Sequence, residues 1–135
     1  MTLSHQQGCD TLVDPPMPGQ FGVTIPETRI TDPRTGGSKG KKLAQFSLIP
    51  SRPLMALAEH YGKGAQKYAE PRNWERGYAW DLSFDAMQRH AWLWWGGEDL
   101  DSETGSNHLT AVAWHSFALL EWSYTHPELD SRSHG

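Results

Sequence analysis

The sequence predicts an all-α fold, a small helical bundle with three main helices that follows an extended, partly disordered N-terminal arm. Apolar residues recur at helical spacing between Ser51 and Tyr124, and all seven tryptophans lie between Trp74 and Trp122. Residues 1–40 instead hold five of the nine prolines and six of the thirteen glycines. The 135 residues suit one domain, and their hydrophobic share of 37% is below the ~45–50% usual for globular chains. We therefore expect part of the chain to stay outside the core.

Composition excludes several classes of protein. No apolar run approaches the ~18 residues that span a bilayer, and residues 1–20 lack the basic start and apolar stretch of a secretory signal. The single cysteine, Cys9, excludes an internal disulfide framework and a cysteine zinc cage. The formal net charge of −4 argues against a nucleic acid polymer as partner, because phosphate neutralisation requires a basic surface. We expect a cytoplasmic protein that binds no membrane.

The predicted arm covers residues 1–45 and contains a basic, glycine-rich segment at 35–42. Three of the five lysines lie in this segment, and glycine N–H groups can approach phosphate closely. Lys39 and Lys42 are therefore candidate phosphate contacts, although a flexible basic linker explains the same residues. The arm leads into the predicted helical domain at 46–127, and a polar tail at 128–135 is expected to fray.

The first predicted helix begins with Ser51 as its cap and ends before Pro71. Its inner stripe is expected at Leu54, Leu57, Ala58, Tyr61, Ala65 and Tyr68. Glu59, Lys63 and Lys67 lie along one face of this helix. They form either an ordinary surface salt bridge between residues four apart, or a metal-binding carboxylate with two lysines toward phosphate oxygens.

The second predicted helix begins near Asp81 or Ser83 and ends at the glycine pair 96–97, and the third begins near Thr104 or Ser106. Their expected inner stripes are Phe84, Met87, Ala91, Trp94 and Trp95 in the second, and Leu109, Val112, Ala113, Ser116, Phe117, Leu120 and Tyr124 in the third. Three helices with short connections indicate a bundle. Because its core is small, we also expect a homo-oligomer that covers the remaining tryptophan surface.

Two further groups of side chains are candidates for nucleotide contacts. Asn73 and Trp74 lie in a loop that is too aromatic for a plain linker, and they are candidates to face a base or sugar. Arg89 and His90 lie on the second predicted helix and are candidates for phosphate or base contacts. For Trp74, packing in the core is the simpler interpretation.

The acidic segment after the second helix is the sharpest candidate for chemistry. It carries four carboxylates within six residues, at Glu98, Asp99, Asp101 and Glu103. Extending the inner stripe of the second helix from Phe84 by fourteen residues places Glu98 inward. Buried like charges raise each other's pKa unless a cation lies between them, and Mg²⁺ or Mn²⁺ takes oxygen ligands. Asp101 reaches the same ion if the helix continues for one more turn, whereas a solvated acidic loop is the alternative.

Two histidines share one face of the third predicted helix. His115 is expected to be an ordinary core histidine. His108 lies in the first turn, directly after the acidic segment, where it can orient a carboxylate or contact a phosphate near the helix N-terminus.

Three blocks of sequence resemble a known family. They are TGGSKGKKLAQFSLIP at 35–50, AEHYGKGAQKYAEPRNWERGY at 58–78 and RHAWLWWGGEDLDSETGSNHLTAVAWH at 89–115. In this order they resemble a phage-associated family of dATP/dGTP diphosphohydrolase-like proteins, placed near the MazG-like all-α nucleoside triphosphate pyrophosphohydrolases. The resemblance implies metal-dependent hydrolysis of purine deoxynucleoside triphosphates to dNMP and pyrophosphate, in the host cytoplasm if a phage encodes the chain.

The resemblance also implies a set of metal ligands. The wider all-α pyrophosphohydrolases hold Mg²⁺ with an ExxE pair on one helix and an ExxD pair on the next. Glu98 and Asp101 match the second pair, whereas Glu59 is the only acid available for the first. The implied catalytic ligands of Mg²⁺ (or Mn²⁺) are therefore Glu59, Glu98 and Asp101, with Asp99, His108 or water as possible completions. Because the first pair is incomplete, a non-catalytic nucleotide-binding protein or a phage accessory or structural protein is the alternative.

The resemblance further implies which side chains contact each part of the substrate. Lys63 and Lys67, with Lys39 or Lys42, would offset the charge of the leaving pyrophosphate. Asn73 and Trp74 would face the base or sugar.

Overall fold

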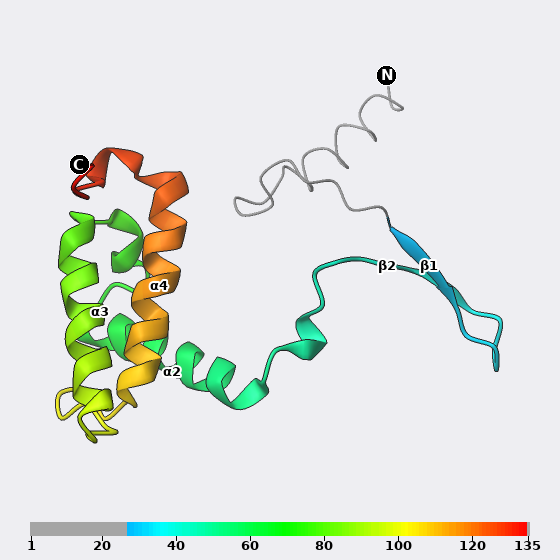
Figure 1. The fold of residues 1–135 in the computed structure, drawn as a ribbon, viewed down its shortest axis with the longest axis horizontal. Coiled ribbons are helices and arrows are strands. Elements are labelled where there is room, and N and C mark those ends of the chain that lie inside the picture. The colour runs from blue at the N-terminus through cyan, green and yellow to red at the C-terminus, as the bar shows by residue number, and fades with distance from the viewer. Residues whose placement is uncertain (1–26, 135) are drawn as a thin grey trace. The chain divides into compact units, whose positions relative to one another are not determined.

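The computed structural model describes residues 27–134. The described residues divide into two compact units, one that ends at Leu48 and one that begins at Ile49. The predicted arm lies largely in the first unit, and the part of that prediction that concerns residues 1–26 falls outside the described residues. The three predicted helices lie in the second unit, which confirms the all-α bundle (Figure 1).

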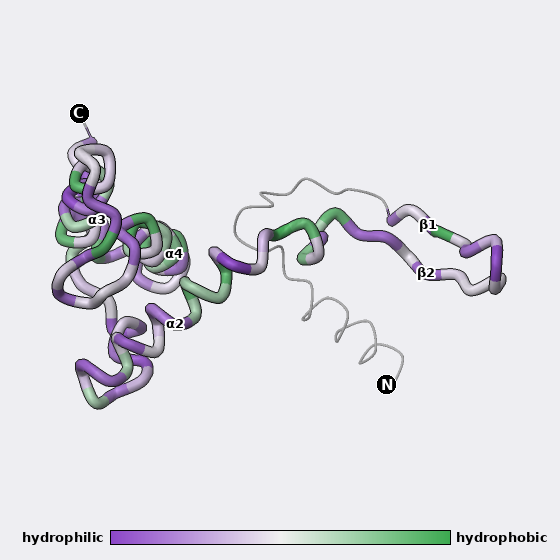
Figure 2. Tube along the Cα trace, turned by 90° about the horizontal axis from the view of Figure 1, so that it is seen from below, coloured by the Kyte–Doolittle hydropathy of each residue, from purple (hydrophilic) through white to green (hydrophobic). Residues whose placement is uncertain are grey.

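The first unit contains a β-hairpin that the sequence analysis did not predict. Strands β1 (Thr28–Thr31) and β2 (Ser38–Lys41) pair in antiparallel register, and a short 3-10 turn, η1 (Phe46–Leu48), follows. The hairpin closes through Gly36, which has a φ of 77° and donates its N–H to the Asp32 carbonyl at 2.8 Å. Hydrophilic residues line this turn (Figure 2). The basic segment expected to be a flexible linker is therefore in large part a strand.

The second unit is built from α2 (Ser51–Tyr68), α3 (Trp80–Trp95) and α4 (His108–Thr125). Two 3-10 turns, η2 (Asn73–Arg76) and η3 (Pro127–Leu129), flank them. Helices α3 and α4 lie side by side and run antiparallel, and α2 packs against α4 (Figure 1). None of the helices in the described part of the chain combines the length and hydropathy that a membrane span requires.

The helix ends follow local chemistry. Helix α3 ends at the predicted glycine pair, where Gly97 adopts a φ of 102° that side-chain-bearing residues avoid. Helix α4 begins later than expected, because the Asn107 side chain, and not Thr104 or Ser106, accepts the Leu109 N–H at 2.8 Å. Helix α2 begins at Ser51 itself, without a side-chain cap.

The core of the second unit is aromatic. Its buried centre is Trp80, Ala118 and Trp122, and the partly buried residues packed on it are Trp74, Tyr78, Trp114, Leu119 and Leu129. The Trp122 indole is fully buried and donates its Nε1–H to the Trp74 carbonyl at 3.1 Å. The Tyr78 ring meets the Trp122 ring edge-on, with centroids 4.8 Å apart. One side chain therefore joins α4 to the loop after α2.

The predicted inner stripe of α4 is wrong in phase, and that of α3 is right only in part, because Met87, Ala91 and Trp94 are half-buried. In α3 the buried residues are Trp80 and Ser83, whereas the expected Phe84 is 51% exposed. In α4 the buried residues are His108, Ala111, Ala118 and Trp122, whereas Phe117 is 55% exposed. Both helices carry large apolar residues on more than one face, so spacing alone does not select the buried one.

Large apolar side chains of α3 and α4 remain at the surface as a result. They are Leu82, Phe84, Trp92, Leu93, Trp95, Leu109, Phe117 and Leu120. Exposed apolar surface of this kind commonly marks an interface. The expected homo-oligomer stays a prediction, and the particle mass in solution, measured by light scattering, decides it.

The end of the described chain is tied to α3 and does not fray. Leu129 packs on the core, and the Ser131 hydroxyl accepts the Asp81 N–H at 2.9 Å while donating to the Asp81 carboxylate at 2.7 Å. The Arg132 guanidinium lies over the Trp80 ring, 5.1 Å from its centroid. The tail therefore caps the N-terminal end of α3.

A short polar chain crosses the packed face of α3 and α4. The Ser83 hydroxyl is fully buried and hydrogen-bonds to the Tyr78 hydroxyl at 2.9 Å and to His115 Nδ1 at 3.1 Å. Burial, together with repulsion from His90 and His60, lowers the pKa of His115 to about 4. His115 is therefore a neutral histidine held within the bundle, as the sequence predicts.

Truncation of Trp122 should destabilise the fold more than any surface change. Trp122→Ala should lower the free energy of unfolding by about 3–5 kcal/mol, because it leaves a large cavity. Trp122→Phe should cost about 1–3 kcal/mol, because the Trp74 carbonyl loses its donor. Trp95→Ala, at a tryptophan that is 75% exposed, is the control and should change stability by under about 0.5 kcal/mol. Urea denaturation measures all three, and equal losses at positions 122 and 95 would contradict the described core.

His115 should make the fold sensitive to acid. The pKa of its imidazole is about 4 in the folded chain against 6.5 ordinarily, so the unfolded chain binds more protons between these pH values. Stability should therefore fall as the pH falls from 6.5 toward 4, by about 2 kcal/mol after allowance for the partly exposed ring. His115→Gln should reduce the loss of unfolding free energy between pH 7 and pH 4.5 by that amount. His134→Gln, at an exposed histidine, should not, and an unchanged acid loss in His115→Gln would refute this account.

Candidate functional site: a histidine and carboxylate cluster beside an aromatic hollow

The acidic segment is a closed turn and not a continuation of α3. Because α3 ends at Trp95, Glu98 and Asp101 do not share a helical face, and this corrects the expectation of one more helical turn. The turn closes through a β-bridge between Leu100 and Asn107 and through the Asp101 N–H, which donates to the Ser106 carbonyl at 2.8 Å. The segment is therefore rigidly shaped by its own backbone.

Glu98, His108 and His90 form a hydrogen-bonded chain. The His108 imidazole is fully buried, and its Nε2 lies 2.6 Å from Glu98 Oε2. Its Nδ1 lies 2.8 Å from Nδ1 of His90, which comes from α3. The Glu98 side chain is 55% exposed, so one oxygen reaches the buried histidine while the group as a whole stays at the surface. Glu98 was expected to point inward, and only its contact with His108 agrees with that expectation.

Asp101 completes a group of three candidate ligands. One ligand atom each from His90, Asp101 and His108 lies within 4.8 Å of the others. Asp101 Oδ2 accepts the Thr104 N–H at 3.1 Å and the Thr104 hydroxyl at 2.9 Å. Partial burial raises the pKa of the Asp101 carboxyl, but these hydrogen bonds and the nearby His90 outweigh it and set the net pKa below its usual range. Asp101 is therefore a carboxylate at neutral pH.

Helix α2 is fastened to the acidic turn by three side chains. His60 Nδ1 lies 2.9 Å from the Ser106 hydroxyl, and Lys63 Nζ donates to the same hydroxyl at 2.8 Å and to the Thr104 carbonyl at 2.9 Å. Lys67 Nζ donates to Glu103 at 3.0 Å. Burial, with repulsion from Lys63 and His90, lowers the pKa of His60. Lys67 thus pairs with a carboxylate of the turn, while Lys63 and His60 hold its backbone and the Ser106 hydroxyl.

His60 is the functional side chain that sequence reasoning missed. Its spacing from Lys63 and Lys67, of three and then four residues, places all three on one helical face and could have found it. His90 was considered for phosphate or base contact, and its neighbours Asp101 and His108 could not be inferred from spacing.

Four other predicted site residues are not among the three clustered ligands. Glu59 is exposed on α2 and is not part of the three-residue cluster. Arg89 is exposed on α3, next to His90. Lys39 lies in β2 and Lys42 directly after it, where Lys42 Nζ is 3.7 Å from Glu27. Both lysines belong to the first unit, so their part in the site stays a prediction.

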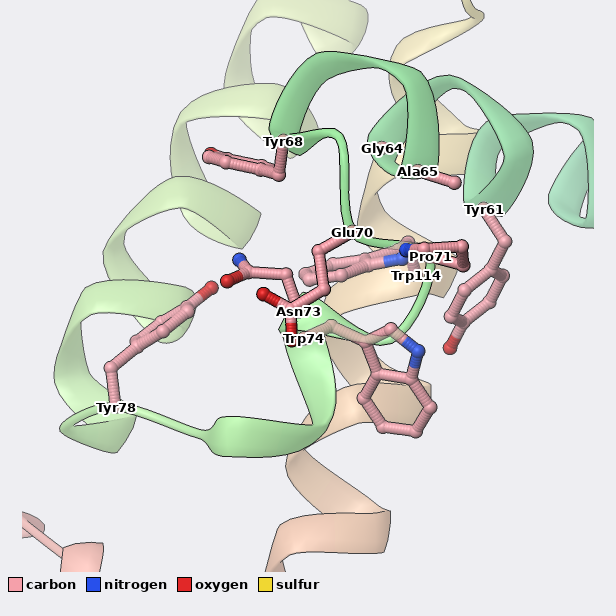
Figure 3. A pocket seen from close by; sticks show the side chains of 10 residues that line it. All are labelled: Tyr61, Gly64, Ala65, Tyr68, Glu70, Pro71, Asn73, Trp74, Tyr78 and Trp114. Atoms are coloured by element: carbon pink, nitrogen blue, oxygen red, sulfur yellow. The ribbon is translucent and has the colours of Figure 1, made fainter.

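An aromatic hollow lies at the C-terminal half of α2. It has a volume of about 70 Å³, and its rings come from Tyr61, Tyr68, Trp74, Tyr78 and Trp114. Asn73 and Glu70 supply polar side chains to the same hollow, which Figure 3 shows among the rings. Asn73 and Trp74, predicted to face a base or sugar, are therefore both in the lining of one hollow.

Trp114 lines the hollow and also contacts two histidines, His60 and His115, outside the three-residue cluster. Its ring lies 5.8 Å from the Tyr61 ring on the side of the hollow. It also lies 6.4 Å from the His60 ring and 4.9 Å from the His115 ring, centroid to centroid. The His115 ring in turn stacks on the His90 ring, with centroids 6.1 Å apart, so Trp114 and His115 together link the hollow to the cluster.

Comparison with known proteins identifies the family. Searches of curated proteins and of solved structures gave no match. A family model described as dATP/dGTP diphosphohydrolase, N-terminal, matches residues 33–132, which include the hairpin's second strand, the hollow and the cluster. Because this match covers most of the chain, the protein belongs to the dATP/dGTP diphosphohydrolase N-terminal family.

Proposed function

We propose that this chain hydrolyses purine deoxynucleoside triphosphates, dATP or dGTP, to dNMP and pyrophosphate in a metal-dependent reaction. The observation that carries the proposal is the aromatic hollow next to the histidine, carboxylate and lysine cluster, in a chain of this family. The aromatic rings around the hollow suit stacking of a base, and the cluster with its lysines suits a triphosphate. A location in the cytoplasm, a phage origin and a kinship with MazG-like enzymes remain predictions.

The base would stack on the aromatic rings at the mouth of the hollow, since a volume of about 70 Å³ does not enclose a purine. Stacking of a base on an aromatic side chain contributes about 1–3 kcal/mol and tolerates any base, so the rings supply affinity and not selectivity. The Asn73 amide offers both a donor and an acceptor, and it is the amide side chain in a lining whose other side chains are mainly aromatic. Asn73 is therefore the residue best suited to recognise the edge of a purine.

The phosphates would lie against α2 and the acidic turn. Lys63 has three N–H donors, of which two reach the Thr104 carbonyl and the Ser106 hydroxyl, so a third can face a phosphate oxygen. Lys67 would exchange or share its contact with Glu103. Positive charge at this place offsets the charge that develops on the leaving pyrophosphate.

The side chains present fit a divalent cation. Asp101 supplies a carboxylate oxygen, and His90 and His108 supply ring nitrogens. A bound cation would polarise the phosphate and lower the pKa of a water molecule. Water would add at the α-phosphorus, the bond from that phosphorus to the bridging oxygen would break, and pyrophosphate would leave. Asp101 and Lys63 would position the triphosphate for this attack.

Product analysis tests the reaction. The purified chain, with Mg²⁺ or Mn²⁺, should convert dATP or dGTP to dNMP and pyrophosphate as resolved by ion-exchange chromatography, and a chelator should stop it. Asp101→Asn should lower kcat at least about 100-fold, because the amide removes the negative charge that the proposed cation would bind. Asp85→Asn, which removes the same charge from an exposed position of α3, is the control and should keep full activity.

Other products or none would reject this reaction. Nucleoside with tripolyphosphate, or dNDP with phosphate, would exclude attack at the α-phosphorus. Nucleotide binding without turnover would favour the non-catalytic alternative, and neither binding nor turnover would favour an accessory or structural protein.

Asn73 should govern recognition of the base. Asn73→Ala should raise KM about tenfold with little change in kcat, because a hydrogen bond to the base edge is worth about 1–1.5 kcal/mol. The control is Gln66→Ala, which removes an amide from an exposed position of α2. Steady-state kinetics with dATP, dGTP and dCTP measures both variants, and a purine preference that survives Asn73→Ala would exclude this role.

A further inference from the structure

The geometry points to a transition-metal site formed by His90, Asp101 and His108, with Glu98 as a positioning residue, that binds Mn²⁺, Co²⁺ or Zn²⁺ in preference to Mg²⁺. This inference deepens the function proposed above. Metal binding is measured directly, however, so the metal-site inference can be tested separately from the proposed hydrolysis.

Three elements bring the ligands together. His90 comes from α3, Asp101 from the acidic turn and His108 from the first turn of α4. Their candidate ligand atoms lie within 4.8 Å of one another. Asp101 and His108 are near each other in the sequence, and the packing of α3 against α4 brings His90 to them.

The ligands are oriented by contacts of the kind found around metal sites. Glu98 Oε2 lies 2.6 Å from His108 Nε2, which directs the Nδ1 of that buried ring toward His90. Histidine ligands commonly donate their other ring N–H to a carboxylate in this way, which fixes the tautomer and the ring orientation. Thr104 holds one oxygen of Asp101 through two hydrogen bonds. These two bonds fix the orientation of the Asp101 carboxylate.

The spacing of the two imidazoles is close to that of ligands on one ion. Their Nδ1 atoms are 2.8 Å apart, which suits a hydrogen bond between the rings. Two nitrogens bound to one metal at about 2.1 Å lie about 3.0–3.4 Å apart. A displacement of a few tenths of an ångström would therefore exchange the shared proton for a metal ion.

The donor set selects the class of metal. Two imidazole nitrogens and one carboxylate suit Mn²⁺, Co²⁺ and Zn²⁺, whereas Mg²⁺ prefers oxygen ligands and keeps its waters. Three protein ligands also leave coordination positions open for water or a phosphate oxygen. Lys63 and His60 face the same turn from α2, and the carboxylates of Glu98, Asp101 and Glu103 offset the positive charge.

Titration of the full, untagged, chelator-treated chain tests the site. Co²⁺ should bind with a stoichiometry of one per chain and give visible ligand-field absorption, and calorimetry should give an affinity for Zn²⁺ at least about 100-fold above that for Mg²⁺. His90→Gln and Asp101→Asn should weaken Co²⁺ binding at least about tenfold, and Glu98→Gln should weaken it about 10–100-fold. Circular dichroism of each variant reports the fold, and His90→Gln and Asp101→Asn spare the buried His108.

Matched controls separate this site from adventitious binding. His134→Gln and Asp85→Asn remove a histidine and an aspartate outside the cluster and should leave Co²⁺ binding unchanged. An absence of Co²⁺ absorption, equal affinity for Mg²⁺ and Zn²⁺, or full Co²⁺ affinity in folded His90→Gln would overturn the proposal. Tight Co²⁺ binding at these residues without nucleotide hydrolysis would support the site and contradict the proposed function.

Discussion

The attachment of α2 to the acidic turn is the constraint on which the candidate site depends. Three carboxylates, Asp99, Asp101 and Glu103, crowd a turn of the backbone, and like charges at this spacing repel. His60, Lys63 and Lys67 meet that turn from α2. Without them the turn would carry uncompensated negative charge, so the position of Asp101 rests on a helix that is about 40 residues earlier in the chain.

Much of the fold could be predicted from sequence because its signals are local. Pro71 and the glycine pair 96–97 end helices for steric reasons that need no tertiary context. The buried faces could not be predicted, because α3 and α4 carry aromatic or aliphatic side chains on several faces. The bundle buries Ser83 and His108, two polar residues, and leaves Phe84 and Phe117 exposed. Hydrophobicity is a poor guide where a hydrogen-bonded network occupies the packed face.

The part of the candidate site that could be predicted also depends on local sequence signals. Asp101 and the orienting contact of His108 follow from short-range spacing within the acidic turn. His90 contacts His108, 18 residues away, and His60 contacts Ser106, 46 residues away. No helical periodicity links residues that far apart, so these contacts could not be predicted from the sequence. Glu98 was expected on a helical extension, whereas the glycine pair turns the chain and presents only one of its oxygens to the interior.

The polar character of the α3–α4 interface has a consequence for the order of folding. The contacts that define the acidic turn join residues at most eighteen apart, such as His90 with His108, and form within a single antiparallel helical hairpin. Such local contacts form early because little loop entropy opposes them. The contacts of α2 with the acidic turn span 36 to 46 residues, and those with Trp114 span more, so they should close later. The hairpin with its histidines in place should therefore form before α2 docks and completes the wall of the aromatic hollow.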